Sequence, residues 1–305
     1  MRHVLTLFDL SPDEIRQIFT LAAELKAKLV QGIREPIYPG RVLAMLFQKQ
    51  SLRTRVSFEC AMAHLGGNSL FLGEDVGWGS RESVADFSRV LSEYVDLIVC
   101  RSKRHSLVAE LAEHSTCPVI NGLTDLAHPC QAITDLFTIQ EHFGDLKNRK
   151  LTYVGDANNV ARSLALCCAQ LGVPFAIASP TGYQFDPAFL EKLAERFPAF
   201  QVEATTDPAA AVDGASAVYT DVWASMGQED EREARCKAFA DYQVDGKLMK
   251  HAKRDAIFLH CLPARRGEEV SAEVIDGPQS VIVQQAGNRL HAQKGLMAWL
   301  LSEGA

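Results

Sequence analysis

The chain has 305 residues, of which 47% are hydrophobic and 23% charged, a composition typical of a folded globular protein. It has 31 basic and 38 acidic side chains, and the formal net charge of −7 argues against a nucleic-acid binder, which would carry a basic face. No apolar run approaches the roughly 18 residues that cross a bilayer. The first residues lack a secretion signal, so we expect a cytoplasmic protein with no membrane partner.

Helix-like and strand-like patterns alternate along the whole chain, which predicts an α/β fold with parallel sheets. Ser11 is expected to cap the first helix, with Pro12 at its first position and Glu14 three residues after the cap. In the first half, helices are predicted over 11–29, 51–65 and 133–143, and strands over 41–47, 95–100 and 118–120.

A second series of elements begins near residue 150. It comprises predicted strands over 151–154, 175–178, 217–220, 256–259 and 281–284, and helices over 159–171, 185–197 and 290–301. The polar segment 145–149 divides two doubly wound domains, 1–145 and 146–305, and the last helix is expected to return to the first domain. Ligands of such sheets collect at the carboxyl ends of strands, so we expect the site in a cleft between the domains.

The segment Ser51-Leu52-Arg53-Thr54-Arg55 stands where a strand and loop enter a helix. Two arginines in a first helical turn oppose the helix dipole, unless an anion binds there. Guanidinium groups grip phosphate oxygens with paired hydrogen bonds. A solvated helix start, with Ser51 as a plain cap, is the alternative.

This segment resembles the carbamoyl phosphate signature of the aspartate and ornithine carbamoyltransferase family, and the resemblance extends over about residues 5–301. The family usually has threonine at Leu52, so one hydroxyl is lost while the backbone N–H is kept. The resemblance implies that carbamoyl phosphate is one substrate and that no metal or organic cofactor is needed. The eight cysteines include no CxxC pair, which agrees with the absence of a zinc site.

Three further segments match the family's carbamoyl phosphate ligands. His128-Pro129-Cys130-Gln131 resembles its His-Pro-x-Gln motif, Arg101 follows a strand where the family has a carbonyl-polarising arginine, and Arg289 precedes the last helix. The implied carbamoyl phosphate ligands are Ser51, Leu52, Arg53, Thr54, Arg101, His128, Gln131, Cys261, Leu262 and Arg289. Without the resemblance, Pro129 would be a simple helix start and Arg101 a surface residue.

The segment from Asp221 to Gly227 carries the Asp-x-x-x-Ser-Met-Gly pattern of the ornithine branch of the family. The resemblance implies that Asp221 binds the α-amino group of ornithine, with Ser225, Met226 and Asn159 beside it. A carboxylate suits an ammonium group, although an aspartate at a strand end is often only a turn residue.

His260-Cys261-Leu262-Pro263 resembles the family's ornithine-type motif and follows a predicted strand. A shielded thiolate can form beside cations, so Cys261 is the candidate acceptor for the proton of the attacking amine. The predicted catalytic residues are therefore Arg53, Arg101, His128 and Cys261. A buried thiol before a proline turn is the alternative.

One departure concerns a loop that, in the family, reaches into a neighbouring subunit's site with a glutamine, histidine or lysine. Gly77 occupies that position here, and Trp78, Ser80 or Arg81 are candidates to compensate. The family forms trimers with shared sites, so a homotrimer is expected.

Three other functions remain open at this point. A carbamoyltransferase could use putrescine, acetylornithine or aspartate. A nicotinamide-dependent dehydrogenase would share the doubly wound fold, but segment 154–160 has one glycine where the dinucleotide motif needs three. A catalytically inactive binding subunit is the third, which the intact motifs disfavour.

Overall fold

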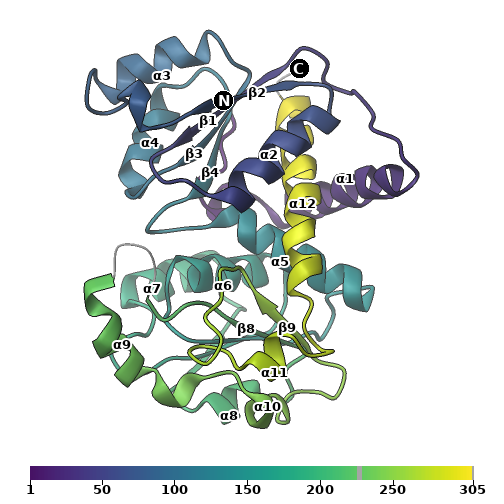
Figure 1. Ribbon diagram of the computed structural model, residues 1–305, viewed down its shortest axis with the longest axis vertical. Coiled ribbons are helices and arrows are strands. Elements are labelled where there is room, and N and C mark those ends of the chain that lie inside the picture. The colour runs from purple at the N-terminus through teal and green to yellow at the C-terminus, as the bar shows by residue number, and fades with distance from the viewer. Residues whose placement is uncertain (225–228, 304–305) are drawn as a thin grey trace. The chain divides into compact units, whose positions relative to one another are not determined.

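The computed structural model describes residues 1–224 and 229–303, which form two compact units (Figure 1). The first unit comprises Met1–Phe137 together with the residues from Gly287 onward, and the second comprises Thr138–Ala286. Helices α5 (Pro129–Phe143) and α12 (Ile282–Glu303) contribute residues to both units. In the described part of the chain, no helix combines the length and apolar character needed to cross a membrane.

The first unit is built on a four-stranded parallel sheet in the order β2-β1-β3-β4. Its strands are β1 (Val42–Phe47), β2 (Asn68–Leu72), β3 (Leu97–Arg101) and β4 (Val119–Leu123), and its other helices are α1 (Pro12–Val30), α2 (Leu52–His64), α3 (Val84–Ser92) and α4 (His105–His114). Short 3₁₀ turns cover Leu7–Asp9 and Glu74–Val76. All of β3 is buried, as expected of a central strand in a parallel sheet.

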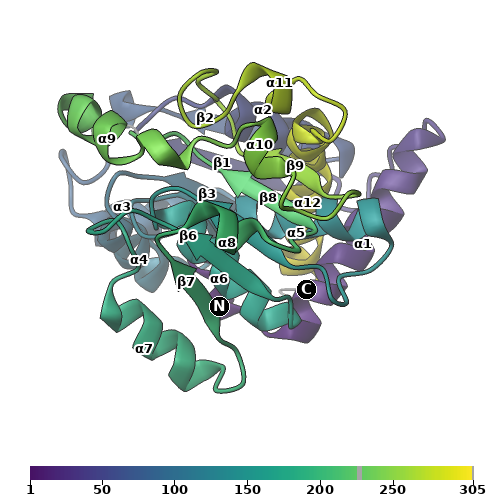
Figure 2. The same ribbon diagram turned by 90° about the horizontal axis from the view of Figure 1, so that it is seen from below.

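The second unit holds a five-stranded parallel sheet in the order β7-β6-β5-β8-β9. Strands β6, β7, β8 and β9 of this sheet are labelled in Figure 2. Its strands are β5 (Leu151–Val154), β6 (Phe175–Ala178), β7 (Val202–Thr205), β8 (Ala217–Thr220) and β9 (Ile257–His260). Its helices are α6 (Asn159–Leu171), α7 (Pro187–Arg196), α8 (Pro208–Val212), α9 (Arg232–Ala238), α10 (Gly246–Met249) and α11 (Ala272–Ile275), with 3₁₀ turns at Glu229–Glu231 and Ala240–Tyr242. Each unit thus contains a doubly wound parallel sheet, which confirms the predicted α/β fold class.

Local capping chemistry set the start of α1 as predicted, whereas α5 starts at Pro129 and α12 at Ile282, ahead of the predicted starts at 133 and 290. Ser11 accepts a hydrogen bond from the Glu14 backbone N–H, and the Glu14 carboxylate accepts one from the Ser11 N–H at 2.7 Å. At α7, predicted to begin at residue 185, the first helical residue is Pro187. It occupies the first position behind the Asp186 cap, where its missing N–H costs nothing.

The prediction of a strand over 281–284 is wrong, because α12 begins at Ile282 and residue 281 directly precedes it. A short apolar run does not distinguish a strand from a buried helix by periodicity alone. The prediction that the last helix packs on the first domain is confirmed. The Tyr38 hydroxyl donates to the Ala298 carbonyl at 2.8 Å, and the Lys294 ammonium donates to the Leu25 carbonyl at 3.3 Å.

Two strands, β2 and β7, were not predicted from the sequence, and both lie at sheet edges. β2 and β7 are only partly buried, so neither shows the continuous apolar run of a central strand. Each sheet reverses its strand order at one place, between β1 and β3 in the first unit and between β5 and β8 in the second. Such reversals are where doubly wound sheets place their ligands.

Candidate active site

The first unit gathers predicted residues at the reversal between β1 and β3. Residues 48–50 lead from β1 into α2, and β3 ends at Arg101. The Ser51 hydroxyl caps α2 by accepting from the Thr54 backbone N–H at 3.3 Å. The N-terminus of α2 adds a partial positive charge at the same edge of the sheet. Strand order and helix dipole therefore both favour an anion here.

The hydroxyl of Thr54 is the common contact of this half-site, and Thr54 is fully buried. Its Oγ1 accepts from the guanidinium groups of Arg101 at 3.3 Å and Arg289 at 2.9 Å, and the Ser51 hydroxyl donates to it at 3.0 Å. Arg289 also donates to the Gln131 side-chain oxygen at 3.1 Å. Five predicted residues from separate parts of the sequence thus form one connected network.

His128 stands directly before α5 and is only 4% exposed. Burial is the largest cause that holds its pKa well below the ordinary value, and three nearby guanidinium groups, those of Arg289, Arg101 and Arg53, act in the same direction. His128 is therefore a neutral hydrogen-bonding group among cations. A neutral imidazole with several guanidinium groups suits an anion that also carries a carbonyl oxygen.

The two arginines of the first turn of α2 have different surroundings. The Arg55 side chain donates to the Glu59 carboxylate at 3.0 Å and lies over the Phe71 ring, 4.0 Å from its centroid. An anion is therefore not needed to explain Arg55, whereas Arg53 is close enough to His128 to lower its pKa. The Leu52 side chain is 77% exposed, so its predicted contribution is limited to its backbone.

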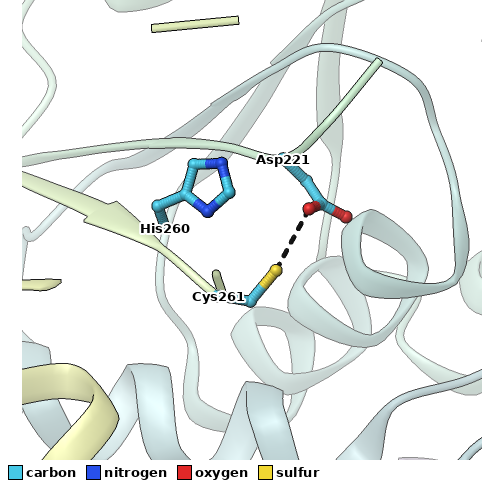
Figure 3. Close-up of side chains that lie close together, drawn as sticks. All are labelled: Asp221, His260 and Cys261. Carbon is cyan, nitrogen blue, oxygen red and sulfur yellow. Dashed lines mark hydrogen bonds between the residues drawn. The ribbon is translucent and has the colours of Figure 1, made fainter. Parts of the chain in front are cut away.

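The second unit gathers the other predicted residues at the reversal between β5 and β8. Asp221 follows β8 and is buried, and Cys261 follows β9. The Cys261 thiol donates to Asp221 Oδ1 at 3.1 Å (Figure 3). This contact places the thiol of Cys261 beside Asp221, as the sequence predicts for the candidate proton acceptor. The Val222 backbone N–H also donates to Oδ1, at 2.8 Å, which fixes the carboxylate's orientation.

Asn158 is a residue of this half-site that sequence reasoning missed. Its side-chain oxygen caps α6 by accepting from the Val160 and Ala161 N–H groups, and its amide nitrogen donates to Asp221 Oδ2 at 3.1 Å. Sequence reasoning selected Asn159, whose side-chain oxygen accepts from the Val160 N–H at 3.0 Å. The available signal was the capping position itself, because an asparagine cap keeps a free amide nitrogen.

The loop that carries Cys261 is held by a buried histidine. His260 Nδ1 accepts from the Leu262 N–H at 2.9 Å, so the ring proton lies on Nε2, which donates to the fully buried Glu269 carboxylate at 3.1 Å. Leu262 has a φ of 59°, a region that non-glycine residues occupy only when neighbouring contacts hold them.

Candidate metal-binding atoms of Asp221, His260 and Cys261 lie within 4.8 Å of one another. Figure 3 shows these three side chains. The histidine fits a metal poorly, because both of its ring nitrogens are engaged, one by Leu262 and one by Glu269. The contacts of this group are explained without an ion.

Ser225 and Met226, predicted at the amine site, lie outside the described residues. The loop containing Gly77 is described. Gly77 has a φ of 69°, and a Cβ there would lie 2.2 Å from Arg81 Cδ. Trp78 is buried in the core of its own unit, and the Ser80 hydroxyl donates to the Gly77 carbonyl at 2.9 Å. Of the three candidates to compensate for Gly77, Arg81 is the exposed charged one.

Comparison with known proteins connects both half-sites to one family. Residues 2–141 match the carbamoyl-P binding domain of aspartate/ornithine carbamoyltransferase, and residues 147–300 match its Asp/Orn binding domain.

The chain belongs to the aspartate/ornithine carbamoyltransferase family.

Relatives within this carbamoyltransferase family cover almost the whole chain. An ornithine carbamoyltransferase of Symbiobacterium thermophilum is 52% identical over 305 residues, covering 99% of this chain and 98% of that protein. The ornithine carbamoyltransferase of Bacillus subtilis is 50% identical, covering 99% and 95%. The solved ornithine carbamoyltransferase of Pyrococcus furiosus superposes with a TM-score of 0.94 at 48% identity, covering 99% and 97%. Membership in this family sets aside the dehydrogenase alternative.

Proposed function

We propose that this family member transfers the carbamoyl group of carbamoyl phosphate to the δ-amine of L-ornithine, giving L-citrulline and phosphate. The observation that carries the proposal is full-length identity of about half to relatives named ornithine carbamoyltransferase. The Asp221–Cys261 pair supports it, because a carboxylate beside a thiol suits a substrate with two amino groups. We retain 1–145 and 146–305 as the two functional domains.

The network around Thr54 is our proposed carbamoyl phosphate site. Arg53, Arg101 and Arg289 neutralise the phosphate, and the first turn of α2 contributes backbone N–H groups from Ser51 to Thr54. Gln131 is proposed to hold the carbamoyl amide. Leu262 and Cys261 are proposed to contact the carbamoyl group from their loop. Three of these residues, Thr54, Gln131 and Arg289, are buried and already oriented by hydrogen bonds to one another.

The carbonyl of carbamoyl phosphate is activated by hydrogen bonds from Arg101, His128 and Thr54. When the amine attacks the carbamoyl carbon, a C–N bond forms and negative charge develops on the carbonyl oxygen. Preorganised donors stabilise that charge because they need not reorient during the reaction. The neutral imidazole of His128 still carries one N–H group, which can donate to this oxygen. The C–O bond to phosphate then breaks, and phosphate leaves with the electron pair and takes up the proton that the attacking nitrogen must lose.

The amine site is proposed at Asp221, Asn159, Ser225 and Met226. The Asp221 carboxylate binds the α-ammonium group of ornithine. Its hydrogen bonds from Asn158 and Val222 fix the direction of its lone pairs, so the substrate's long axis is set before reaction.

Cys261 is our proposed acceptor for the δ-amine's proton. An alkyl ammonium has a pKa of ~10.4, so about one molecule in a thousand is neutral at pH 7. The Cys261 thiol first releases its own proton to solvent as the substrate enters. The resulting thiolate then accepts a proton from the δ-ammonium group, which leaves a thiol beside the neutral amine. The entering ammonium group supplies the positive charge that a thiolate requires.

The proposal is tested by measuring carbamoylated product with carbamoyl phosphate and a panel of L-ornithine, N-acetylornithine, putrescine and L-aspartate. Strong preference for L-ornithine supports it. Preference for another amine would keep the carbamoyl phosphate site and reject the ornithine assignment. No product from any amine would favour an inactive binding subunit.

We also propose a cytoplasmic homotrimer with shared sites. The first unit exposes apolar side chains suited to a subunit contact: Leu52 and Val56, one turn apart on α2, are 77% and 44% exposed, and Leu70 on the edge strand β2 is 47% exposed. Arg81, folded against Gly77, is our candidate donor to the neighbouring site. Sedimentation of the wild type should give three times the chain mass, and Leu70→Glu should lower it.

A further inference from the structure

Arg235 is a buried cation that belongs to neither proposed substrate site. It lies on α9, and only 7% of the residue is exposed. Its Nη1 donates to the Asp156 carboxylate at 2.7 Å and to the Trp223 backbone carbonyl at 3.2 Å, and its Nε donates to Glu231 at 2.9 Å. The guanidinium also lies 5.1 Å from the centroid of the Tyr183 ring. A charge buried to this extent requires such partners.

The partners of Arg235 stand next to the proposed amine-binding residues. Asp156 lies in the turn between β5 and α6, two positions before Asn158. Trp223 lies in the loop after β8, two positions after Asp221. One nitrogen of Arg235 therefore joins the two chain segments that leave the sheet at its strand-order reversal, the same two segments that the Asn158–Asp221 hydrogen bond joins.

Arg235 also controls the charge beside Asp221. Burial raises the pKa of Asp156 and the nearby Asp221 carboxylate raises it further, whereas the hydrogen bond and charge of Arg235 lower it. The Arg235 guanidinium thus offsets the negative charge of Asp156, which leaves Asp221 as the carboxylate available to an ammonium group. Without Arg235, a second carboxylate would lie beside it with no guanidinium to offset its charge.

We propose that Arg235 is a positioning residue for the amino-acid substrate: it holds the β5–α6 turn and the loop after β8 in register and keeps Asp221 as the anionic partner of the substrate's α-amino group. This inference rests on the proposed amine site at Asp221. Arg235 touches neither Asp221 nor Cys261 through any of its hydrogen bonds described above, so its effect passes through Asp156 and Trp223.

The test separates the two substrates kinetically. Arg235→Met is expected to raise the KM for L-ornithine about tenfold or more, since one misplaced charged contact costs at least ~1.4 kcal/mol, which is a factor of ten. The KM for carbamoyl phosphate should stay within about twofold. Arg235→Lys should recover part of the loss, because it restores the charge but not all three hydrogen bonds of the guanidinium group. The matched control is Arg232→Met, because Arg232 lies on the same helix, is about half exposed and pairs with Glu268.

A general loss of folded enzyme would lower kcat alone and leave both KM values unchanged, and that outcome would overturn the proposal. Equal rises in the two KM values would overturn it as well. If Arg235→Met does not fold, Asp156→Asn and its combination with Arg235→Lys supply the test. The two changes should be non-additive on the ornithine KM if they act through one contact. Wild-type turnover of L-ornithine reports separately on the proposed function.

Discussion

The Arg289 guanidinium donates a 2.9 Å hydrogen bond to the Thr54 hydroxyl, joining α12 to the first turn of α2 across 235 positions of sequence. The last helix of the chain therefore completes a site that begins near residue 51. Arg289→Met should raise the KM for carbamoyl phosphate about tenfold to a hundredfold, because a hydrogen bond to a charged group contributes ~1.5–3 kcal/mol. Steady-state kinetics with saturating ornithine measures this, and an unchanged KM would remove Arg289 from the site.

Arg53 and Arg55 offer a matched pair on one helical turn. Arg53→Ala should lower kcat/KM about a hundredfold or more and leave the fold intact, because it removes a guanidinium beside His128. Arg55→Lys should change kcat/KM less than about threefold, because lysine can still pair with Glu59. Circular dichroism controls for folding. Near-wild-type turnover by folded Arg53→Ala would refute its role.

The Cys261 thiol can be tested with a change that preserves its hydrogen bond. In Cys261→Ser, a hydroxyl can still donate to Asp221 but cannot accept a proton as a thiolate does. We expect kcat to fall about a hundredfold, within the usual range for loss of a proton acceptor. The remaining rate should rise about tenfold per pH unit between roughly pH 7 and 9, following the neutral δ-amine. A variant with the wild-type pH profile would show that the thiol takes no proton.

Burial of His128 predicts how stability depends on pH. Its folded-state pKa lies well below the ordinary value, so the unfolded chain binds the proton more readily. The stabilising contribution is complete above a pH of about 6.5 and is lost progressively as the pH falls toward the folded-state value. His128→Gln should therefore show a smaller loss of stability between about pH 6.5 and 5 than the wild type in urea titrations. Parallel curves for the two proteins would contradict this.

The sequence by itself determined the fold class, most of the central elements and the segments that carry the chemistry. Strands such as Leu151–Val154 and Phe175–Ala178 were predicted with the bounds observed, because a central parallel strand is a continuous apolar run. The start of α1 was predicted because capping chemistry is encoded within four consecutive residues. Edge strand β2 and the residues at the start of α12 were not, because their patterns are ambiguous without neighbours.

Only the tertiary structure decided which of those segments meet. Three of the contacts join residues that are 63 to 235 positions apart: Asn158 with Asp221, Arg235 with Asp156, and Arg289 with Thr54. Arg235 also contacts Trp223, which is 12 positions away. Local patterns carry no information on strand order, and strand order places the ends of β5 and β8 side by side. Burial likewise decided that His128 stays neutral, because desolvation and nearby charge depend on the packed neighbours and not on the residue alone.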